Sequence, residues 1–221
     1  MGTIDSVNLG KATPSAHTHV RVTGIGKVPV SEPVQVRAPG PEGVGGSGLA
    51  GDDVCDLRFH GGDDKAVYAY AAEDLRYWEV ELGRELVPGS FGENLTTSGL
   101  DLNGARIGQR WRVGDDLVLE VSQPRTPCRT FAGALGVQRW MRTFVTVGRP
   151  GAYLRVLHPG SVAAGDHVEV LDPPAHDVTV SLAFRAMTTE RGLLPDVLAA
   201  GPALGGELRR LAESPRVRQS G

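Results

Sequence analysis

One cysteine lies in a sequence context that favours chemistry. Cys128 follows a predicted strand, in the segment Ser122-Gln-Pro-Arg-Thr-Pro-Cys-Arg129, where two prolines stiffen the loop and two arginines flank the sulfur. Positive neighbours lower the pKa of a thiol, and the thiolate is the form that attacks electrophiles and binds soft metals. We therefore take Cys128 as a candidate functional residue, with an ordinary loop cysteine as the alternative. The other cysteine, Cys55, alternates with apolar residues and is predicted to be a buried small hydrophobe.

A double-glycine turn offers a second candidate site. The segment Arg58-Phe-His-Gly-Gly-Asp-Asp-Lys65 follows another predicted strand. Glycines let backbone amides approach an anion, and His60 and Lys65 add donors and positive charge. Lys65 is conspicuous because the chain has only three lysines beside twenty arginines. The spacing differs from that of a Walker loop, and the alternative is a solvated hairpin turn.

A third segment combines an aromatic residue with an amide. In Pro88-Gly-Ser-Phe-Gly-Glu-Asn94, Phe91 lies between small residues and Asn94 precedes a predicted strand. An Asn side chain can both donate to and accept from the edge of a heterocycle, whereas the alternative is a turn capped by Asn. The remaining histidines lie in predicted loops or at strand edges and are expected on the surface: His17, His19, His158, His167 and His176.

Short strands separated by glycine and proline must position these residues. Thirty glycines and fifteen prolines favour many short strands over long helices. Alternation and β-branching predict strands at residues 20–23, 33–36, 54–59, 93–97, 110–113, 117–122, 153–157 and 167–171. Helical periodicity is clearest over Glu73–Leu82, and residues 130–135 and 138–146 could also be helical. The predicted fold class is therefore mainly β, with a closed barrel favoured over a layered parallel sheet. The glycine-rich segment Gly43–Gly48 is predicted to be a flexible surface loop.

A composition break at Asp172-Pro-Pro174 divides the chain. Beyond it, residues 178–187, 193–199 and 204–212 have helical patterns, which predict a small three-helix appendage. The predicted domains are a barrel over residues 1–173 and a helical segment over residues 174–221, with a frayed end from residue 214. An apolar stripe on these helices could pair subunits into a homodimer, and the oligomeric state stays open.

Composition and charge exclude several classes of protein. A length of 221 residues suits one large domain, or one domain with a small appendage. A net charge of −3 leaves no global basic field for a nucleic-acid polymer. No apolar run approaches the roughly 20 residues of a membrane helix, so no membrane partner is expected. Two cysteines and the lack of a secretory signal make the protein an expected resident of the cytoplasm.

Several of these segments occur together in a known order. They are Arg58-Phe-His-Gly-Gly, Lys65-Ala-Val-Tyr-Ala-Tyr70, Phe91-Gly-Glu-Asn-Leu95, Ile107-Gly108 with Arg112-Val-Gly114, Val121-Ser-Gln-Pro-Arg125 with Cys128, and Tyr153-Leu-Arg-Val-Leu157. In this order they resemble the MOSC domain, and more closely the YiiM-type proteins. The match also takes in residues 6–10 and 23–30, so it spans nearly the whole chain. The C-terminal helices look like the three-helix segment that follows MOSC in this group.

The resemblance implies a β-rich MOSC barrel that binds molybdenum cofactor, a molybdenum–pyranopterin. Cys128 corresponds to the cysteine that ligates the metal in cofactor-loaded relatives, which makes it the implied catalytic residue and metal ligand. YiiM-type proteins act as reductases of N-hydroxylated bases and related N-oxygenated compounds, with electrons from a separate flavoprotein reductase. The resemblance therefore implies that a small-molecule N–OH group is reduced to N–H with release of water.

The resemblance also implies cofactor-binding roles for the candidate residues. Arg125 and Arg129 would keep Cys128 deprotonated. Asn94 and Gln123 would read the amide edge of the pterin by hydrogen bonds. The terminal phosphate of the cofactor would lie against a positive, donor-rich set of residues: His60, Gly61, Gly62, Lys65 and Arg125.

Some features of the chain leave alternatives open. Glu93 is considered as a proton donor. The residues after Cys128 are Arg129-Thr-Phe131, where the family suggests an aromatic residue and a lysine, so the substrate side of the site is less defined. One alternative function is a molybdenum cofactor carrier or sulfur-transfer module that uses Cys128. Another is a non-catalytic binding module that uses the turn at residues 60–65 and the C-terminal helices.

Overall fold

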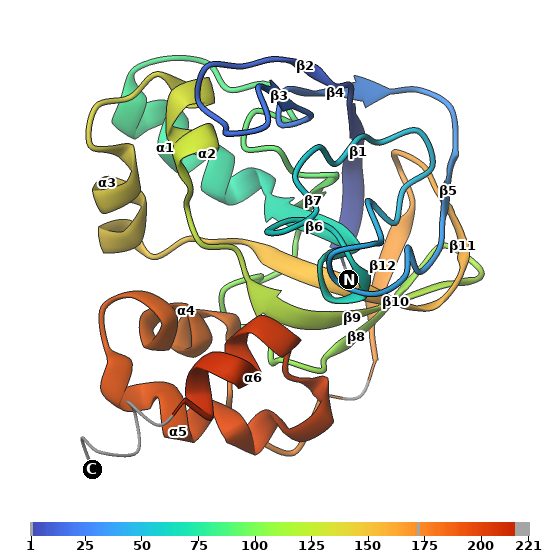
Figure 1. Ribbon diagram of the computed structural model, residues 1–221. Helices are drawn as coiled ribbons and strands as arrows, with labels where there is room; N and C mark the ends of the chain where they lie inside the picture. Colours follow the sequence, from blue (N-terminus) through green and yellow to red (C-terminus); the bar gives the residue numbers. More distant parts are fainter. Residues whose placement is uncertain (1, 172, 215–221) are drawn as a thin grey trace.

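Seven strands close into a barrel in the computed structural model of this chain, which describes residues 2–171 and 173–214 (Figure 1). The order around the ring is β12-β8-β9-β10-β6-β7-β1, and β1 pairs again with β12. The ring strands are β1 (Gly2–Gly10), β6 (Val67–Ala71), β7 (Leu95–Ser98), β8 (Arg110–Val113), β9 (Leu117–Pro124), β10 (Ala152–His158) and β12 (His167–Val170). The predicted closed barrel is confirmed.

One neighbouring pair in the ring is parallel and the others are antiparallel. The parallel pair is β6 with β7, and such a pair requires a crossover connection. Helix α1 (Ala72–Leu82) supplies this crossover and confirms the predicted helix at residues 73–82. It ends at Gly83, which adopts a left-handed conformation and donates its N–H to the carbonyls of Glu79 and Val80.

Short strands outside the ring hold the first part of the chain against the barrel. They are β4 (Lys27–Val30), which pairs with β1, β2 (Thr13–Pro14) with β3 (Val22–Thr23), and β5 (Val34–Val36) with β11 (Gly160–Val162). The predicted strand at residues 33–36 corresponds to β5, and the predicted strand at 20–23 is shorter than expected. Two loops next to these strands, at residues 15–21 and 37–62, reach the candidate site.

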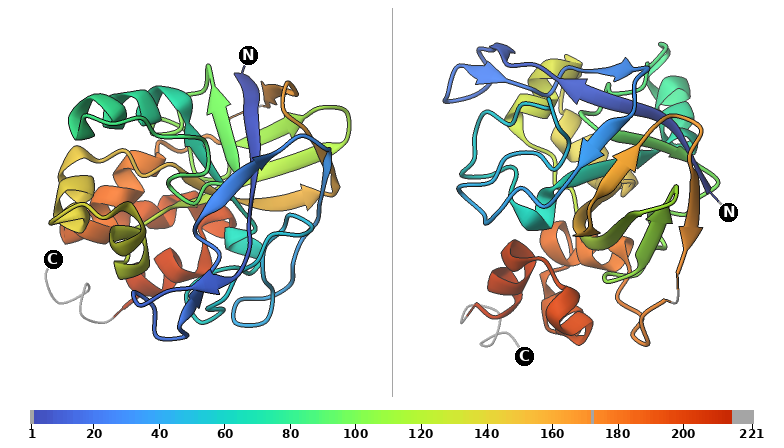
Figure 2. Two further views of the ribbon diagram at one scale, coloured as in Figure 1. Left: turned by 90° about the horizontal axis from the view of Figure 1, so that it is seen from above. Right: turned by 90° about the vertical axis from the view of Figure 1, so that its right-hand side faces the viewer.

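The helices gather on one side of the barrel (Figure 2). Helix α1 packs with α2 (Arg129–Leu135) and α3 (Trp140–Val147) around a buried aromatic cluster. Within this cluster the ring centroids of Trp78 and Trp140 lie 4.7 Å apart, and those of Phe91 and Phe131 lie 5.1 Å apart. Aromatic packing of this kind fixes the start of α2, which directly follows Cys128.

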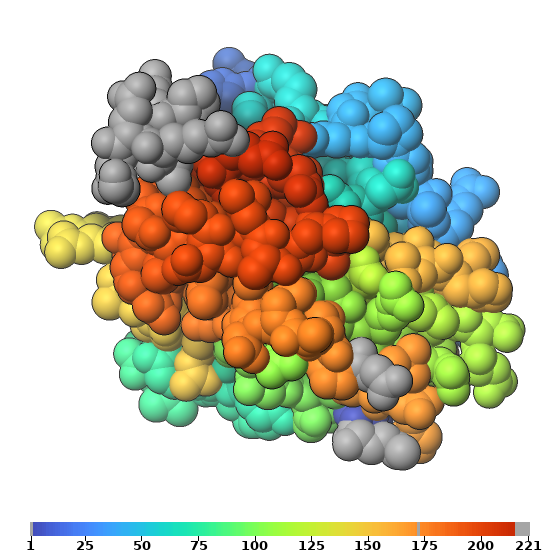
Figure 3. All heavy atoms as spheres, turned by 90° about the horizontal axis from the view of Figure 1, so that it is seen from below, coloured from blue at the N-terminus to red at the C-terminus, as the bar shows by residue number. Residues whose placement is uncertain are grey.

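The C-terminal segment forms the three predicted helices. They are α4 (Val180–Thr188), α5 (Leu194–Val197) and α6 (Gly206–Ala212), with 3-10 turns at Arg191–Leu193 and Leu198–Ala203. The segment covers one face of the molecule, where α6 lies beside the loop around residue 42 (Figure 3). Its apolar side chains, among them Ala183 and Leu208, belong to the same buried cluster as the barrel interior. The domain boundary between residues 173 and 174 stays a prediction. The frayed end expected from residue 214 falls, except for residue 214 itself, outside the described residues.

The predicted strand at residues 54–59 is wrong, because this segment is a loop. Asp56 turns the chain here: its carboxylate accepts from the N–H of Arg58 (3.3 Å), and its carbonyl accepts from the N–H groups of Phe59 (3.3 Å) and His60 (3.1 Å). Local hydrogen bonds of this kind compete with a strand ladder. The loop also leaves Cys55 half-buried at a cavity, so the prediction of a core cysteine is wrong as well.

The longest ring strand, β1, has no clear apolar pattern in the sequence. Its buried positions include Ser6 and Asn8. Ser6 Oγ donates to Asn8 Oδ1 (2.7 Å), and Asn8 Nδ2 donates to Thr96 Oγ1 of β7 (3.0 Å). These hydrogen bonds let polar side chains lie inside the sheet, so alternation of apolar residues does not reveal the strand.

Candidate functional site

A cavity of about 870 Å³ is lined by both barrel strands and outer loops. The lining comes from the ends of β9 and β10, the loops at residues 16–25 and 52–61, the turn before α2 and the start of α6. Most of the predicted site residues line this one cavity: His60, Gly61, Lys65, Asn94, Gln123, Arg125, Cys128 and Arg129. Gly62 is not part of the lining. The cavity is of a size that accommodates a cofactor.

A break in strand register lies where two side chains reach the cavity. Tyr153 of β10 pairs with Gln123 of β9, whereas Leu154 pairs with Val121, so Ser122 is the extra residue in the register of β9. Such an irregularity is typical of a β-bulge, which re-aims side chains and is common next to functional sites. Tyr153 and Gln123 both line the cavity.

Cys128 is the N-cap residue of α2, and its sulfur accepts from the N–H of Phe131 (3.4 Å). Burial opposes ionisation of the thiol. The hydrogen bond from His60, the charge of Arg125 and the N–H of Phe131 outweigh burial, and they lower the pKa of Cys128 to about 6. At neutral pH the sulfur is therefore mainly a thiolate.

Arg125 is buried without a carboxylate partner among the described residues, with 5% of its surface exposed. Its guanidinium donates to the carbonyl of Phe91 and lies 4.8 Å from the ring centroid of Tyr68 and 4.3 Å from that of Phe131. Aromatic faces stabilise a cation but leave its net charge in place. This buried charge therefore favours an anion in the cavity, and the nearby thiolate of Cys128 is one.

The double-glycine turn packs against the glycine-rich loop at residues 43–48. Gly61 and Gly62 have φ angles of 77° and 80°, which L side chains rarely adopt. A Cβ on Gly61 would lie 2.6 Å from the carbonyl oxygen of Gly45. The N–H of Gly62 donates to the carbonyls of Gly45 (2.9 Å) and Gly46 (3.1 Å), so it is not free to bind an anion. The structure does not support the predicted anion-binding role of Gly62. In the loop at residues 43–48, Gly43 and Val44 are exposed as predicted for a surface loop, whereas Gly45 and Gly48 are buried.

Lys65 already contacts a carboxylate of the protein. Its Nζ donates to the carbonyl of Phe59 (2.9 Å) and forms an ion pair with Glu207 of α6 (2.6 Å). Gln123 Nε2 donates to the same carboxylate (3.4 Å), while Gln123 Oε1 is buried and has no hydrogen-bond partner among the described residues. The predicted phosphate-binding lysine and the predicted pterin-reading amide therefore meet at Glu207.

Asn94 lines the cavity, but contacts within the protein use its amide. Its Oδ1 accepts from the N–H of Tyr68 (3.1 Å), and its Nδ2 donates to Asp52 (2.9 Å) and to the carbonyl of Asn8 (3.4 Å). Asp52 also forms a buried ion pair with Lys27. Asn94 therefore holds the loop that carries Asp52, and this geometry does not favour the predicted reading of a pterin edge.

Arg129, the first residue of α2, is exposed and lines the cavity. His17 and His19 are exposed as predicted, and both line the same cavity. Thr130 Oγ1 donates to the carbonyl of His17 (3.4 Å), so the hairpin of β2 and β3 lies against the start of α2. Arg129 therefore lies at the solvent-exposed side of the cavity, whereas the charge of the buried Arg125 acts on Cys128.

Glu93 is fully buried and is not part of the cavity lining. Its carboxylate accepts from the N–H groups of Gly89 (2.6 Å) and Phe91 (2.9 Å) and from the hydroxyl of Thr96 (3.1 Å). Burial raises the pKa of Glu93 even though these hydrogen bonds act in the opposite direction. Glu93 therefore organises the turn that carries Phe91, and the structure does not support its role as a proton donor.

Several charged residues of the cavity were not singled out by the sequence patterns, among them Lys27, Asp52 and Glu207. Lys27 is one of only three lysines, and this scarcity is a signal that could have identified it. Nothing in the local sequence distinguishes Glu207 from a solvated helix carboxylate. Within residues 2–171 and 173–214, no group of three or more His, Cys, Asp or Glu side chains could hold a metal ion, and no helix has the length and apolarity needed to span a membrane.

A closed barrel, a cavity around a thiolate and a C-terminal helical segment together define a class of protein. The model of the MOSC domain matches residues 56–169, which include Cys128 and much of the cavity lining. The chain therefore belongs to the MOSC domain family. Within the family it is of the YiiM type: the crystal structure of YiiM from Geobacillus stearothermophilus is similar with a TM-score of 0.78 and 28% identity, and the match covers 98% of this chain and 100% of that chain.

Two curated relatives are similar in sequence. The uncharacterized protein YflK of Bacillus subtilis is 38% identical over 181 residues, which is 81% of this chain and 78% of the relative. A protein of Gibberella moniliformis named "Reductase" is 33% identical over 138 residues, which is 61% of this chain and 24% of the relative. The matched residues therefore span about a quarter of the fungal protein.

Proposed function

We propose that this chain is a molybdenum-cofactor-binding oxidoreductase that reduces N-hydroxylated bases or related N-oxygenated compounds, with electrons from a separate flavoprotein reductase. The observation that carries the proposal is the thiolate of Cys128, which lies at a large cavity beside the buried cation of Arg125. Membership of the MOSC family and a relative named as a reductase support it. The overall reaction consumes two electrons and two protons, replaces N–OH by N–H and releases water.

The residues of the cavity fit the cofactor. A thiolate is the protein donor suited to a soft metal centre, and Cys128 would be the ligand. His60 and Arg129 offer donors to an anionic group, and a volume of about 870 Å³ leaves room for a pyranopterin and a small substrate. When bound, the cofactor would supply the two-electron chemistry at the N–O bond.

The chain's own residues would bind and orient the cofactor and exclude water from it. Arg125 and His60 keep the Cys128 sulfur ionised. The rings of Tyr68 and Phe131 cover the guanidinium of Arg125 and separate it from solvent. A charge held in a water-poor site acts more strongly on an anion than the same charge in water, so this arrangement favours a thiolate ligand.

The first test is the molybdenum and pterin content of protein expressed in a host that makes abundant cofactor. We expect near-stoichiometric metal in the wild type and loss of most of it in Cys128→Ser. Cys55→Ser is the matched control, because it removes the other cysteine of the same cavity and should keep the metal. Full metal content in Cys128→Ser would contradict the assignment of the ligand.

Turnover is the second test. Metal-loaded protein with an electron donor should convert an N-hydroxylated purine to the corresponding amine, measured by chromatography. If the metal-loaded protein leaves this purine unchanged, N-hydroxylated bases are excluded as its substrate class. Sulfur that cyanide releases from Cys128, without turnover, would instead favour the sulfur-transfer alternative, to which a thiolate of low pKa is equally suited.

A further inference from the structure

Two donors with little solvent exposure form an anion subsite at the cavity, which we define as Nζ of Lys65 and Nε2 of Gln123. The side chain of Lys65 is 10% exposed, and Gln123 is 1% exposed. Both donors converge on Oε2 of Glu207, at 2.6 and 3.4 Å. Donors that converge on one carboxylate oxygen are arranged to bind an anion. The side chain of Glu207 is 42% exposed, so this anion reaches the subsite from the outside.

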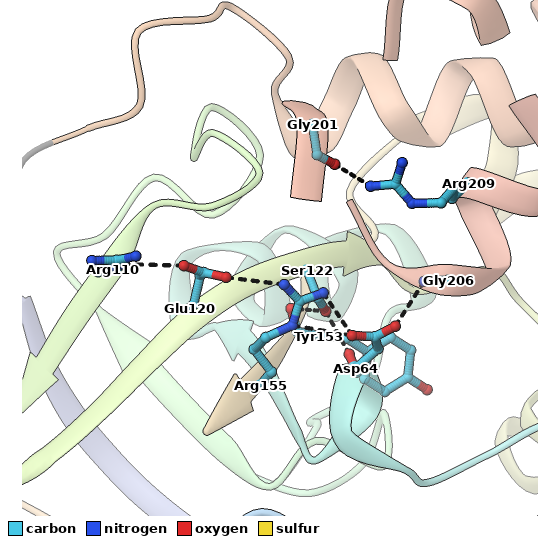
Figure 4. Close-up of polar contacts among 9 residues, drawn as sticks. All are labelled: Asp64, Arg110, Glu120, Ser122, Tyr153, Arg155, Gly201, Gly206 and Arg209. Atoms are coloured by element: carbon cyan, nitrogen blue, oxygen red, sulfur yellow. Dashed lines mark hydrogen bonds and ion pairs between the residues drawn. The ribbon is translucent and has the colours of Figure 1, made fainter. Parts of the chain in front are cut away.

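A second carboxylate, that of Asp64, links the two chain segments that carry this ion pair (Figure 4). Asp64, which precedes Lys65, accepts from Nη2 (2.6 Å) and Nε (3.0 Å) of Arg155. Its other oxygen accepts from the N–H of Gly206 (2.7 Å), which precedes Glu207. The Asp64–Gly206 hydrogen bond therefore joins the residues that directly precede Lys65 and Glu207. This hydrogen bond places the Glu207 carboxylate opposite the Lys65 ammonium group.

Helix α6 does not depend on Glu207 to stay in place. Leu208 and Ala212 of this helix are buried in the core. Arg210 pairs with Glu42 of the neighbouring loop at 2.8 Å. The carboxylate of Glu207 can therefore leave the subsite by side-chain rotation while the helix keeps its position.

A displaced Glu207 side chain has a second cationic neighbour. A smaller cavity of about 250 Å³ adjoins the main one, and Lys65, Gln123 and Glu207 line both. Its lining also includes the acidic residues Glu42, Asp63 and Asp64, so a released carboxylate would turn toward Arg210 and solvent instead. Arg210 lies three residues further along α6. Burial raises the pKa of Glu207, but the charges of Lys65 and, more weakly, of Arg210 contribute to a net lowering of this pKa. Residues three apart are neighbours on a helix surface. A released carboxylate therefore keeps a cationic neighbour.

We propose that Glu207 determines specificity for ligands that carry a phosphate group. Its carboxylate occupies the anion subsite until a phosphate group displaces it. A phosphate dianion carries more charge and more acceptor oxygens than a carboxylate, so it gains more from Lys65 and Gln123. A neutral ligand leaves the ion pair intact and binds elsewhere in the cavity. The proposal rests on the proposed function in one respect, that the phosphate belongs to the cofactor or to a nucleotide substrate.

Inorganic phosphate and full-length, cofactor-free protein test this inference without the metal. In isothermal titration, phosphate should bind Glu207→Gln about tenfold more tightly than the wild type, a difference of about 1.4 kcal/mol, because the glutamine no longer competes. Glu207→Asp keeps the negative charge and should stay near the wild type. Lys65→Met should lose phosphate binding. Glu213→Gln is the matched control, because this carboxylate lies just past the end of α6 and outside the cavity lining, and it should bind phosphate as the wild type does.

Equal phosphate affinity in Glu207→Gln and the wild type would overturn the proposal. Weaker binding in Glu207→Gln would also overturn it, because Glu207 would then be part of the subsite rather than its occupant. So would the absence of phosphate binding in every variant. The same titration of cofactor-loaded protein identifies the source of the phosphate group. If the loaded protein no longer binds inorganic phosphate, the phosphate of the cofactor occupies the subsite; if it binds inorganic phosphate as before, the subsite serves a nucleotide substrate. Either result supports the proposal. Failure of the loaded protein to reduce N-hydroxylated compounds would remove the proposed function and leave the phosphate result standing.

Discussion

Cys128 owes its ionisation to neighbours from three parts of the chain. His60 comes from the loop at residues 52–61, Arg125 directly follows β9, and the N–H of Phe131 belongs to the first turn of α2. Burial alone would keep the thiol protonated. The flanking arginines indicated a lowered pKa from the sequence, and the fold adds a contribution from His60 that no local pattern indicates.

We expect alkylation of cofactor-free protein by iodoacetamide to follow the ionisation of Cys128. Because its pKa is lowered to about 6, the reactive thiolate is present above that pH and is lost as the pH falls through it. An unperturbed cysteine titrates at about 8.5. His60→Gln should move the midpoint upward, since it removes a hydrogen bond to the thiolate.

Mass spectrometry of the alkylation rate over a pH series measures this midpoint. The series is best run in a Cys55→Ser background, because burial and the nearby carboxylate of Asp53 raise the pKa of Cys55 and its slower reaction would otherwise overlap. A Cys128 midpoint near that of a free cysteine in this background would contradict the role of His60 and Arg125.

The buried ion pair of Lys27 and Asp52 should contribute strongly to stability. Lys27→Met leaves the Asp52 carboxylate, with 1% side-chain exposure, without its cation. Removal of one partner from a buried pair typically costs about 3–5 kcal/mol. Urea denaturation measures the change in the free energy of unfolding. Lys11→Met at an exposed lysine is the control, with an expected change below about 0.5 kcal/mol, and equal stability of the two variants would contradict this argument.

Elements with a regular apolar pattern were predictable from the sequence, and elements held by polar contacts were not. Strands β8 and β9 and helix α1 lie where alternation and helical periodicity placed them. The segment at residues 54–59 has the same alternation, but hydrogen bonds to Asp56 turn it into a loop. Likewise, Cys128 and Lys65 were identified from neighbouring residues, whereas Glu207 reaches the site from a helix near the other end of the chain, which only tertiary structure reveals.

The double-glycine turn yields a prediction at the scale of a loop. Gly61 and Gly43 have φ angles of 77° and 83°, so an alanine at either position costs about 1–2 kcal/mol from the left-handed conformation. A Cβ on Gly61 would also lie 2.6 Å from the carbonyl of Gly45, whereas one on Gly43 meets nothing within 4 Å. Gly61→Ala should therefore have the lower melting temperature in thermal unfolding. Equal melting temperatures would show that the glycine-rich loop moves aside freely.

At the scale of the whole molecule, the C-terminal helices are part of the site and of the core. Helix α4 contacts β9, and Arg106, which precedes β8, pairs with Asp177 (2.7 Å). Asp64 joins Arg155 of the barrel to Gly206 of α6, and Glu207 lines the cavity. Because both apolar packing and polar contacts cross the predicted domain boundary, we expect the two parts to unfold together.

Leu208→Ala tests this expectation. Leu208 is fully buried in a cluster that also holds Trp111 of β8, and Leu→Ala changes in cores cost about 2–5 kcal/mol. In urea, tryptophan fluorescence and far-ultraviolet circular dichroism should give one coincident transition, shifted to lower urea in the variant. Leu157→Ala at an exposed leucine of β10 is the control and should shift little. An early helical transition with an unchanged fluorescence transition would instead make residues 174–221 an independent unit, since the barrel would then keep its stability without the packing of α6.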